Sequence, residues 1–182
     1  MRSDKLTTRF QQALQDAQSL ALHNDNQQIE PVHVLAAMLD QDGGSTRSVL
    51  AKAGVAVDRL RSTLGREMDK LPQVEGGDAG EIYVSRDLSN LFNVADKAAG
   101  KRGDSYVASE HFLMALTEDK GAAGQSLRDN GGDKQALEKA IEQVTGGEKV
   151  DDPEAEEERE ALEKYTIDLT ERAAQGNLDP VI

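Results

Sequence analysis

The sequence predicts an all-α fold built from a duplicated four-helix unit and followed by a linker helix. Sliding the 182-residue chain by 78 positions aligns apolar residues with apolar residues, and it also aligns His33 with His111. Within each copy, apolar residues recur every three or four positions, which is the spacing of one helical face. Similarity at a fixed period indicates an internal repeat. We therefore expect one domain over 1–145, with repeats at about 4–71 and 85–145 related by pseudo-twofold symmetry.

The first repeat is predicted to hold four helices, at about 8–21, 31–42, 45–53 and 58–71. Thr7 and Thr8 are both candidates for the N-terminal cap of the first helix. Pro31 suits the first turn of the second helix, where its missing N–H leaves no hydrogen bond unmade. Ser45 can begin the short third helix, and Gly54 ends it.

The second repeat carries the same signals and predicts helices at about 86–100, 110–116, a short segment ending near 130, and 134–145. Their expected N-terminal caps are Ser85, Ser109 and Asp133. Between the repeats, residues 72–84 do not fit a helix, and 82–84 has the composition of an extended segment.

After the duplicated unit the composition changes. Residues 146–163 hold nine carboxylates and two basic side chains, a net charge of −7. This run predicts an acidic, solvated linker. A helix beginning at Pro153 carries spaced apolar residues and is expected to stop at Gly176.

Composition narrows the class of protein. The chain has no cysteine, which excludes disulfides and thiolate metal sites and fits a reducing compartment. Neither an 18-residue apolar run nor a signal peptide is evident, so we expect a cytoplasmic protein without a membrane partner. No basic stripe offsets the net charge of −13, so nucleic acid is not an expected partner.

Candidate reactive groups are few, and we predict neither a catalytic residue nor a metal site. Of the histidines, His33 and His111 lie near equivalent helix starts, His23 lies elsewhere, and no helix supplies the further ligands that a metal needs. We interpret His33 and His111 as half-buried packing residues. Asp104 and Glu110 flank a helix start in repeat 2, where acids serve as caps more often than as an acid–base pair.

A binding groove is the functional feature that the pattern favours. Two packed helical units normally leave a groove, and Phe92 and Val94 flank the apolar face of the first helix of repeat 2. Phe92 aligns with Leu14, so its spacing also fits a core residue. Val94 lies off the apolar stripe and is the better surface candidate.

Five segments are distinctive: "KLTTRFQQALQDAQSLA", "IEPVHVLAAML", "LPQVEG", "SEHFLMAL" and, above all, "KYTIDLTERAAQGNLDPVI". Together they resemble the start of ClpB-type disaggregase chaperones, which belong to the AAA+ ATPases. The resemblance covers essentially the whole chain, and the internal repeat matches the duplicated Clp N-terminal motif. Protease-coupled Clp unfoldases share that motif but usually differ in the "KYTIDLTERA" passage, which favours the disaggregase branch.

The resemblance implies a parent protein that is a homohexamer, uses ATP and magnesium, and works with a DnaK-type chaperone system. The nucleotide-binding loop of the family lies downstream of "DPVI". Residues 164–182 would therefore be only the first edge of an ATPase module. We expect no cofactor and no enzymatic activity in the 182 residues themselves.

The resemblance also implies substrate-binding residues, which are Thr7, Asp104, Glu110, Phe92, Val94 and His111. The first three match the threonine of "KLT" and the acids of "RGD" and "SE", which are implicated in substrate handling. The next two match a groove beside the first helix of repeat 2. The last stands at the expected edge of that groove, where relatives often carry Leu.

These features predict a substrate-recognition domain that binds exposed hydrophobic segments of unfolded or aggregated polypeptides and delivers them to an ATPase pore. One alternative is an adaptor-docking domain, as in protease-coupled relatives, which would bind a folded partner. A third hypothesis is a small hydrolase that uses Asp104 and Glu110.

Overall fold

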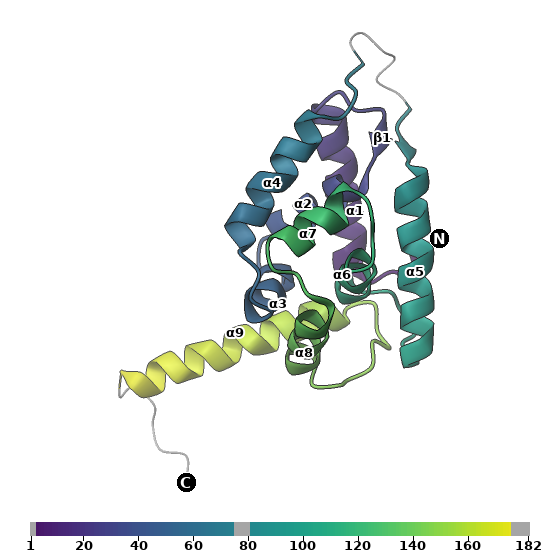
Figure 1. The fold of residues 1–182 in the computed structure, drawn as a ribbon. Helices are drawn as coiled ribbons and strands as arrows, with labels where there is room; N and C mark the ends of the chain where they lie inside the picture. Colours follow the sequence, from purple (N-terminus) through teal and green to yellow (C-terminus); the bar gives the residue numbers. More distant parts are fainter. Residues whose placement is uncertain (1–2, 75–80, 176–182) are drawn as a thin grey trace.

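Helices make up most of the structure, a computed structural model that describes residues 3–74 and 81–175 (Figure 1). The predicted all-α, duplicated fold is confirmed. Repeat 1 holds η1 (Ser3–Lys5), α1 (Thr8–His23), α2 (Pro31–Asp40), α3 (Thr46–Lys52) and α4 (Val57–Asp69). Repeat 2 holds α5 (Arg86–Arg102), α6 (Ser109–Leu116), α7 (Ala122–Asp129) and α8 (Lys134–Thr145). The remaining described elements are α9 (Ala155–Ala174) and two short strands, β1 (Gln28–Ile29) and β2 (Tyr83–Val84).

Three of the predicted helix caps are confirmed, whereas Thr8 is the first residue of α1 and not its cap. Thr7, Ser85 and Asp133 each precede a helix, and each side chain accepts the backbone N–H three residues later, at 3.1 to 3.2 Å. Ser45 precedes α3 but makes no such side-chain bond. The prediction for Ser109 is wrong, because α6 already begins at this residue.

Two short parallel strand pairings join the repeats, and they are copies of each other. In one, Ile29 of β1 pairs with Val84 of β2. In the other, Leu6 pairs with Val107, and the Val107 carbonyl accepts the next N–H of the N-terminal segment at 3.0 Å. Positions 29 and 107 are equivalent in the two repeats, as are positions 6 and 84. In each repeat, the segment before the first helix therefore pairs with the other repeat. The two pairings are related by the pseudo-twofold symmetry of the fold. The extended segment expected at 82–84 is confirmed, whereas β1 was not predicted, because two residues show no alternating pattern.

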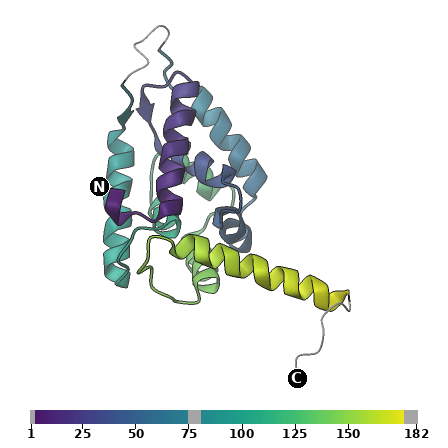
Figure 2. The ribbon, with the colours of Figure 1, turned by 180° about the vertical axis from the view of Figure 1, so that it is seen from behind.

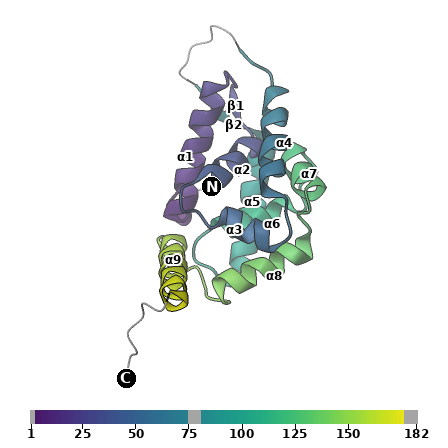
Figure 3. The same ribbon diagram turned by 90° about the vertical axis from the view of Figure 1, so that its left-hand side faces the viewer.

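The two repeats share one hydrophobic core. α3 packs on α8 and α4 packs on α7, which are equivalent pairings of the two copies (Figure 3). All three phenylalanines of the chain meet in this core. The Phe10 ring centroid lies 5.5 Å from that of Phe112 and 6.3 Å from that of Phe92. These aromatic contacts tie α1 to α5 and α6.

The helix predicted after Pro153 is confirmed as α9, and its two halves differ. The first half packs against the domain below α1, and the second half projects away from it (Figures 1 and 2). Val150 and Glu156 are only 4% and 1% exposed, so this part of the expected linker is not solvated. The division into a linker over 146–163 and an ATPase edge over 164–182 stays a prediction, and 176–182 lies outside the described residues.

Candidate functional site

The recurring histidines cap the N-terminus of the second helix in each repeat. His33 Nδ1 and His111 Nδ1 each accept the backbone N–H three residues earlier, both at 2.8 Å. Each Nε2 contacts the residue seven positions earlier, either Asn26 Oδ1 at 2.9 Å or Asp104 Oδ2 at 2.8 Å. Because Nδ1 accepts from an amide, Nε2 carries the proton and donates it. Both rings are buried packing groups, more deeply than the half-buried state expected from the sequence.

Asp104 links repeat 2 to the segment that leads into α9. Its carboxylate accepts from His111, accepts the Val150 N–H at 2.9 Å, and lies 3.6 Å from Arg102 Nε. Burial by itself would raise the pKa of Asp104, but the two hydrogen bonds and the charge of Arg102 together lower that pKa below its usual value. The side chain is 2% exposed, so its interactions are internal to the chain.

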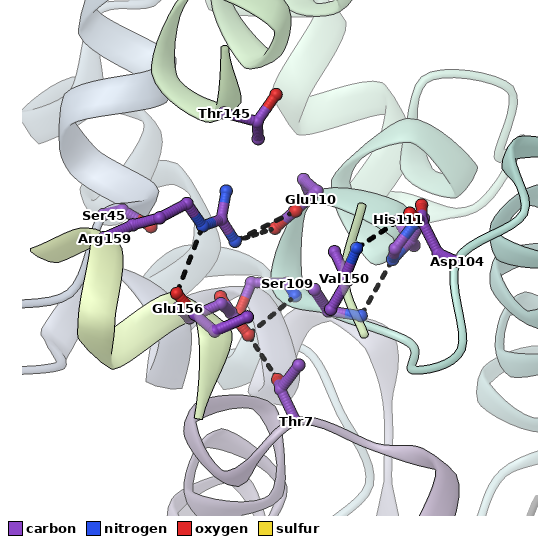
Figure 4. A network of polar contacts seen from close by, with 12 residues as sticks. Thr7, Ser45, Asp104, Ser109, Glu110, His111, Thr145, Val150, Glu156 and Arg159 are labelled. Atoms are coloured by element: carbon purple, nitrogen blue, oxygen red, sulfur yellow. Dashed lines mark hydrogen bonds and ion pairs between the residues drawn. The ribbon is translucent and has the colours of Figure 1, made fainter. Parts of the chain in front are cut away.

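A second polar cluster holds the start of α9 (Figure 4). The Thr7 hydroxyl and the Ser109 N–H both donate to Glu156 Oε2, the latter at 3.2 Å. One turn further along α9, Arg159 Nη2 contacts the two carboxylate oxygens of Glu110 at 3.0 and 3.2 Å. We call Thr7, Ser109 and Glu110 the α9 pocket. All three residues are buried beneath the helix that they bind.

A groove of about 680 Å³ lies between α5, α6 and α8. Its apolar lining consists of Val94, Ala98, Met114, Ala115 and Ile141. Charged side chains of both signs border it, namely Lys97, Lys101, Arg102, Glu118, Lys134, Glu138 and Glu142. Val94 is 43% exposed and therefore available to a ligand. An apolar lining with a charged border suits a ligand that buries an apolar group and keeps its polar groups near water.

Phe92 and Val94 were expected to share one groove, and the structure separates them. Phe92 is half-buried and faces Phe10 and Phe112, whereas Val94 lines the groove. Residues two positions apart on an α-helix point about 200° apart, so they cannot lie on the same face. The core interpretation of Phe92 is therefore correct. Met114 and Ile141 line the groove but were not predicted, because their spacing also fits ordinary core positions.

Four other expected substrate-binding residues have buried side chains that bond to their own chain: Thr7, Asp104, Glu110 and His111. The expectation that His111 lies at the groove edge is wrong, because its ring is 2% exposed and faces Asp104. In this conformation a polypeptide cannot touch these side chains. A role for them in substrate handling would act through the helix and loop that they hold.

The acids expected as a possible catalytic pair lie in separate contacts. Asp104 and Glu110 contact different basic partners and do not form an acid pair. Among residues 3–74 and 81–175, no group of three or more His, Cys, Asp or Glu could hold a metal ion. Across the same residues, no helix has the length and apolar character needed to cross a bilayer. The duplicated scaffold defines a class of helical repeat domain that presents an open groove with an apolar lining.

Sequence comparison gives the family of this domain. Residues 5–130 match the family described as Clp repeat (R) N-terminal domain, and the chain belongs to this family. All 182 residues align with the chaperone protein ClpB of Vibrio cholerae serotype O1 at 53% identity. They align with ClpB of Pseudomonas putida strain KT2440 at 46% identity. The chain spans 21% of the length of each of these relatives.

Solved structures share the fold. The Hsp104 N-terminal domain from Candida albicans matches with a TM-score of 0.73 and 23% identity, over 84% of this chain and 99% of that one. The N-domain of ClpV from Vibrio cholerae matches with a TM-score of 0.64 and 21% identity, over 77% of this chain and 84% of that one. At these identities the likeness concerns the fold alone. The expected resemblance to ClpB-type chaperones is confirmed by the sequence relatives.

Proposed function

We propose that this chain is the substrate-recognition domain of an ATP-dependent disaggregase, and that the groove between α5, α6 and α8 binds exposed hydrophobic segments of unfolded or aggregated polypeptides. The observation that carries the proposal is the open apolar lining of this groove around the exposed Val94. The similarity of the whole chain to proteins named as chaperones supports it. Burying one valine side chain contributes roughly 1.5 kcal/mol, so each contact is weak and a bound segment can be handed on.

On this proposal the rest of the protein supplies the energy. The 182 residues contain no G-x-x-x-x-G-K-[ST] loop for nucleotide phosphates. The parent protein would be a cytoplasmic, homohexameric AAA+ ATPase that uses ATP and magnesium and works with a DnaK-type chaperone system. A tethered binding domain would raise the local concentration of clients near the ATPase pore without adding a contact there.

The substitution Val94→Asp should weaken binding of an unfolded polypeptide about tenfold, because it places a charge in the apolar lining of the groove. The probe is a reduced, carboxymethylated protein carrying a fluorophore, and its dissociation constant is measured by anisotropy. Leu22→Asp is the matched control, because Leu22 is also 43% exposed but lies on α1 and does not line the groove. Equal affinity of Val94→Asp and Leu22→Asp would reject the groove as the binding site.

An adaptor-docking domain is the second candidate, and the charged border of the groove favours it, since fixed charges of both signs suit a folded partner. The two functions differ in what the partner must be. The same fluorescent protein, tested with its disulfides intact and reduced, separates them. We expect binding only of the unfolded form. Binding of a folded partner with no affinity for unfolded chains would favour the adaptor function.

A further inference from the structure

The α9 pocket exists in only one of the two symmetric positions of the fold. At the other position, the residues equivalent to Thr7, Ser109 and Glu110 are Ser85, Pro31 and Val32. A proline has no N–H to donate to a carboxylate, and a valine cannot pair with an arginine. The second position keeps a hydroxyl in Ser85, which bonds to Glu30, but it lacks the N–H donor and the acid that Ser109 and Glu110 supply at the first. The asymmetry indicates that this position is specialised for the glutamate and the arginine of one turn of α9.

Burying Glu156 in the α9 pocket carries a desolvation cost, which weakens its binding there. Glu156 lies where the starts of α1 and α6 converge, and a carboxylate is favoured at such helix starts. However, Glu156 Oε1 and the Ser109 hydroxyl are buried with no hydrogen-bond partner in the described residues. Removing a carboxylate from water costs several kcal/mol, and two bonds to one oxygen offset only part of this.

The other contacts of α9 with the domain are also polar. Arg9 of α1 pairs with Glu160, whose other carboxylate oxygen accepts the Ser45 N–H at 3.2 Å. Further along, Leu162 and Tyr165 are 66% and 61% exposed and add little buried apolar area. Mainly charged and polar groups therefore hold the helix, and the favourable free energy of each such contact is offset by the cost of removing its groups from water.

We propose that the α9 pocket is an intramolecular docking site for residues 154–160, and that α9 alternates between a docked and a released state. Release would add the seven residues of 154–160 to the tether, which corresponds to roughly 15 Å of additional reach. Val150 stays anchored by Asp104. If the chain is the recognition domain proposed above, this reach sets how far the domain moves from its ATPase. Thr7 and Glu110 would then affect substrate handling as positioning residues that hold the tether.

The symmetry of the fold supplies a clean test. Ser109→Pro copies Pro31 at the equivalent first helical position, where proline is tolerated. The preceding residue has φ −103° and ψ 172°, close to the φ −100° and ψ 162° that precede Pro31, so the backbone already fits. The Ser109 hydroxyl has no partner, so the substitution removes only the N–H donated to Glu156.

Docking is measured as a distance between spin labels on cysteines introduced at Gln18 of α1 and Glu171 of α9, since the chain has no native cysteine. We expect one narrow distance distribution in the labelled chain without further substitutions. Ser109→Pro and Glu110→Val should broaden it and lower the docking constant at least about tenfold. Glu158→Ala, on the exposed side of α9, is the control and should keep the narrow distribution. Circular dichroism verifies that each variant is folded.

A variant on the helix side keeps the test decisive if a pocket variant unfolds. Arg159 lies on α9, outside the two repeats, so Arg159→Leu removes the pairing with Glu110 without changing the domain. It should broaden the distribution as Glu110→Val does. A narrow distribution in Ser109→Pro, Glu110→Val and Arg159→Leu alike would overturn the docking site. None of these measurements needs a client, so the result is independent of the proposed function.

Docking should also depend on pH. Burial, followed by the charge of Glu110, raises the pKa of Glu156 to about 7, against the opposing bonds from Ser109 and Thr7. The groups facing Glu156 are Thr7 from α1 and Ser109 and Glu110 from α6, with Glu110 itself paired to Arg159. A raised pKa means that docking takes up a proton, so its contribution is greatest at acidic pH and is lost as the pH rises through 7.

We expect the docking constant to fall about tenfold between pH 6 and pH 8. The same spin-label distance measures it, and Glu156→Gln, which cannot titrate, should show no such change. If the docking constant of Glu156→Gln depends on pH as strongly as that of the chain with Glu156, the assignment to Glu156 is contradicted.

Discussion

Asp104→Ala should lower the free energy of unfolding by about 3 kcal/mol, because it leaves two buried donors without an acceptor. The Val150 N–H and His111 Nε2–H both donate to this carboxylate, and Arg102 loses its nearby charge. Asp104→Asn keeps one acceptor oxygen and should cost roughly half as much. Urea unfolding followed by circular dichroism measures the difference, since the chain has no tryptophan.

The control for Asp104 is Asp16→Ala on the exposed side of α1, which should change the unfolding free energy by less than about 0.5 kcal/mol. If Asp104→Ala costs no more than Asp16→Ala, the internal network does not stabilise the fold and the position is free to serve a ligand. The comparison therefore separates a structural role of Asp104 from the substrate-contact role that the family resemblance implies.

Acidification from pH 6.5 to pH 4 should remove about 3 kcal/mol of stability through His33 alone. Burial lowers the pKa of His33 from 6.5 to about 4. In the unfolded chain His33 therefore binds a proton below about pH 6.5, whereas in the folded domain it binds one only below about pH 4. This stability is fully present above pH 6.5 and is lost as the pH falls through that window.

The matched variants are His33→Gln and His23→Gln. His33 is fully buried, whereas His23 is exposed at the end of α1. Urea unfolding at several pH values should give a shallower acid slope for His33→Gln and an unchanged slope for His23→Gln. If the unfolding free energy of His33→Gln falls with pH as steeply as that of the unsubstituted chain, the acid sensitivity belongs to other groups.

The elements of the fold follow from local signals, and the polar sites do not. Apolar spacing, a capping Thr7 and the first-turn Pro31 act within a few residues, so the chain displays them directly. Val94 was also recognisable, since a residue off the apolar stripe of its helix must point elsewhere. By contrast, the bond from Thr7 to Glu156 joins residues 149 positions apart, and no local pattern marks it.

The sequence by itself determined the duplication, the helices and the recurrence of the histidines, because each depends on contacts within a repeat or on a fixed 78-residue offset. Only the tertiary structure decided what the repeated residues face. In the folded protein each repeat pairs a strand segment with the other repeat. Phe92 packs against the core, whereas Val94 lines the groove. Glu156 contacts Thr7 and Ser109. The physical reason is that partners of buried polar groups are set by how helices pack in space, whereas periodicity records only which face of each helix is apolar.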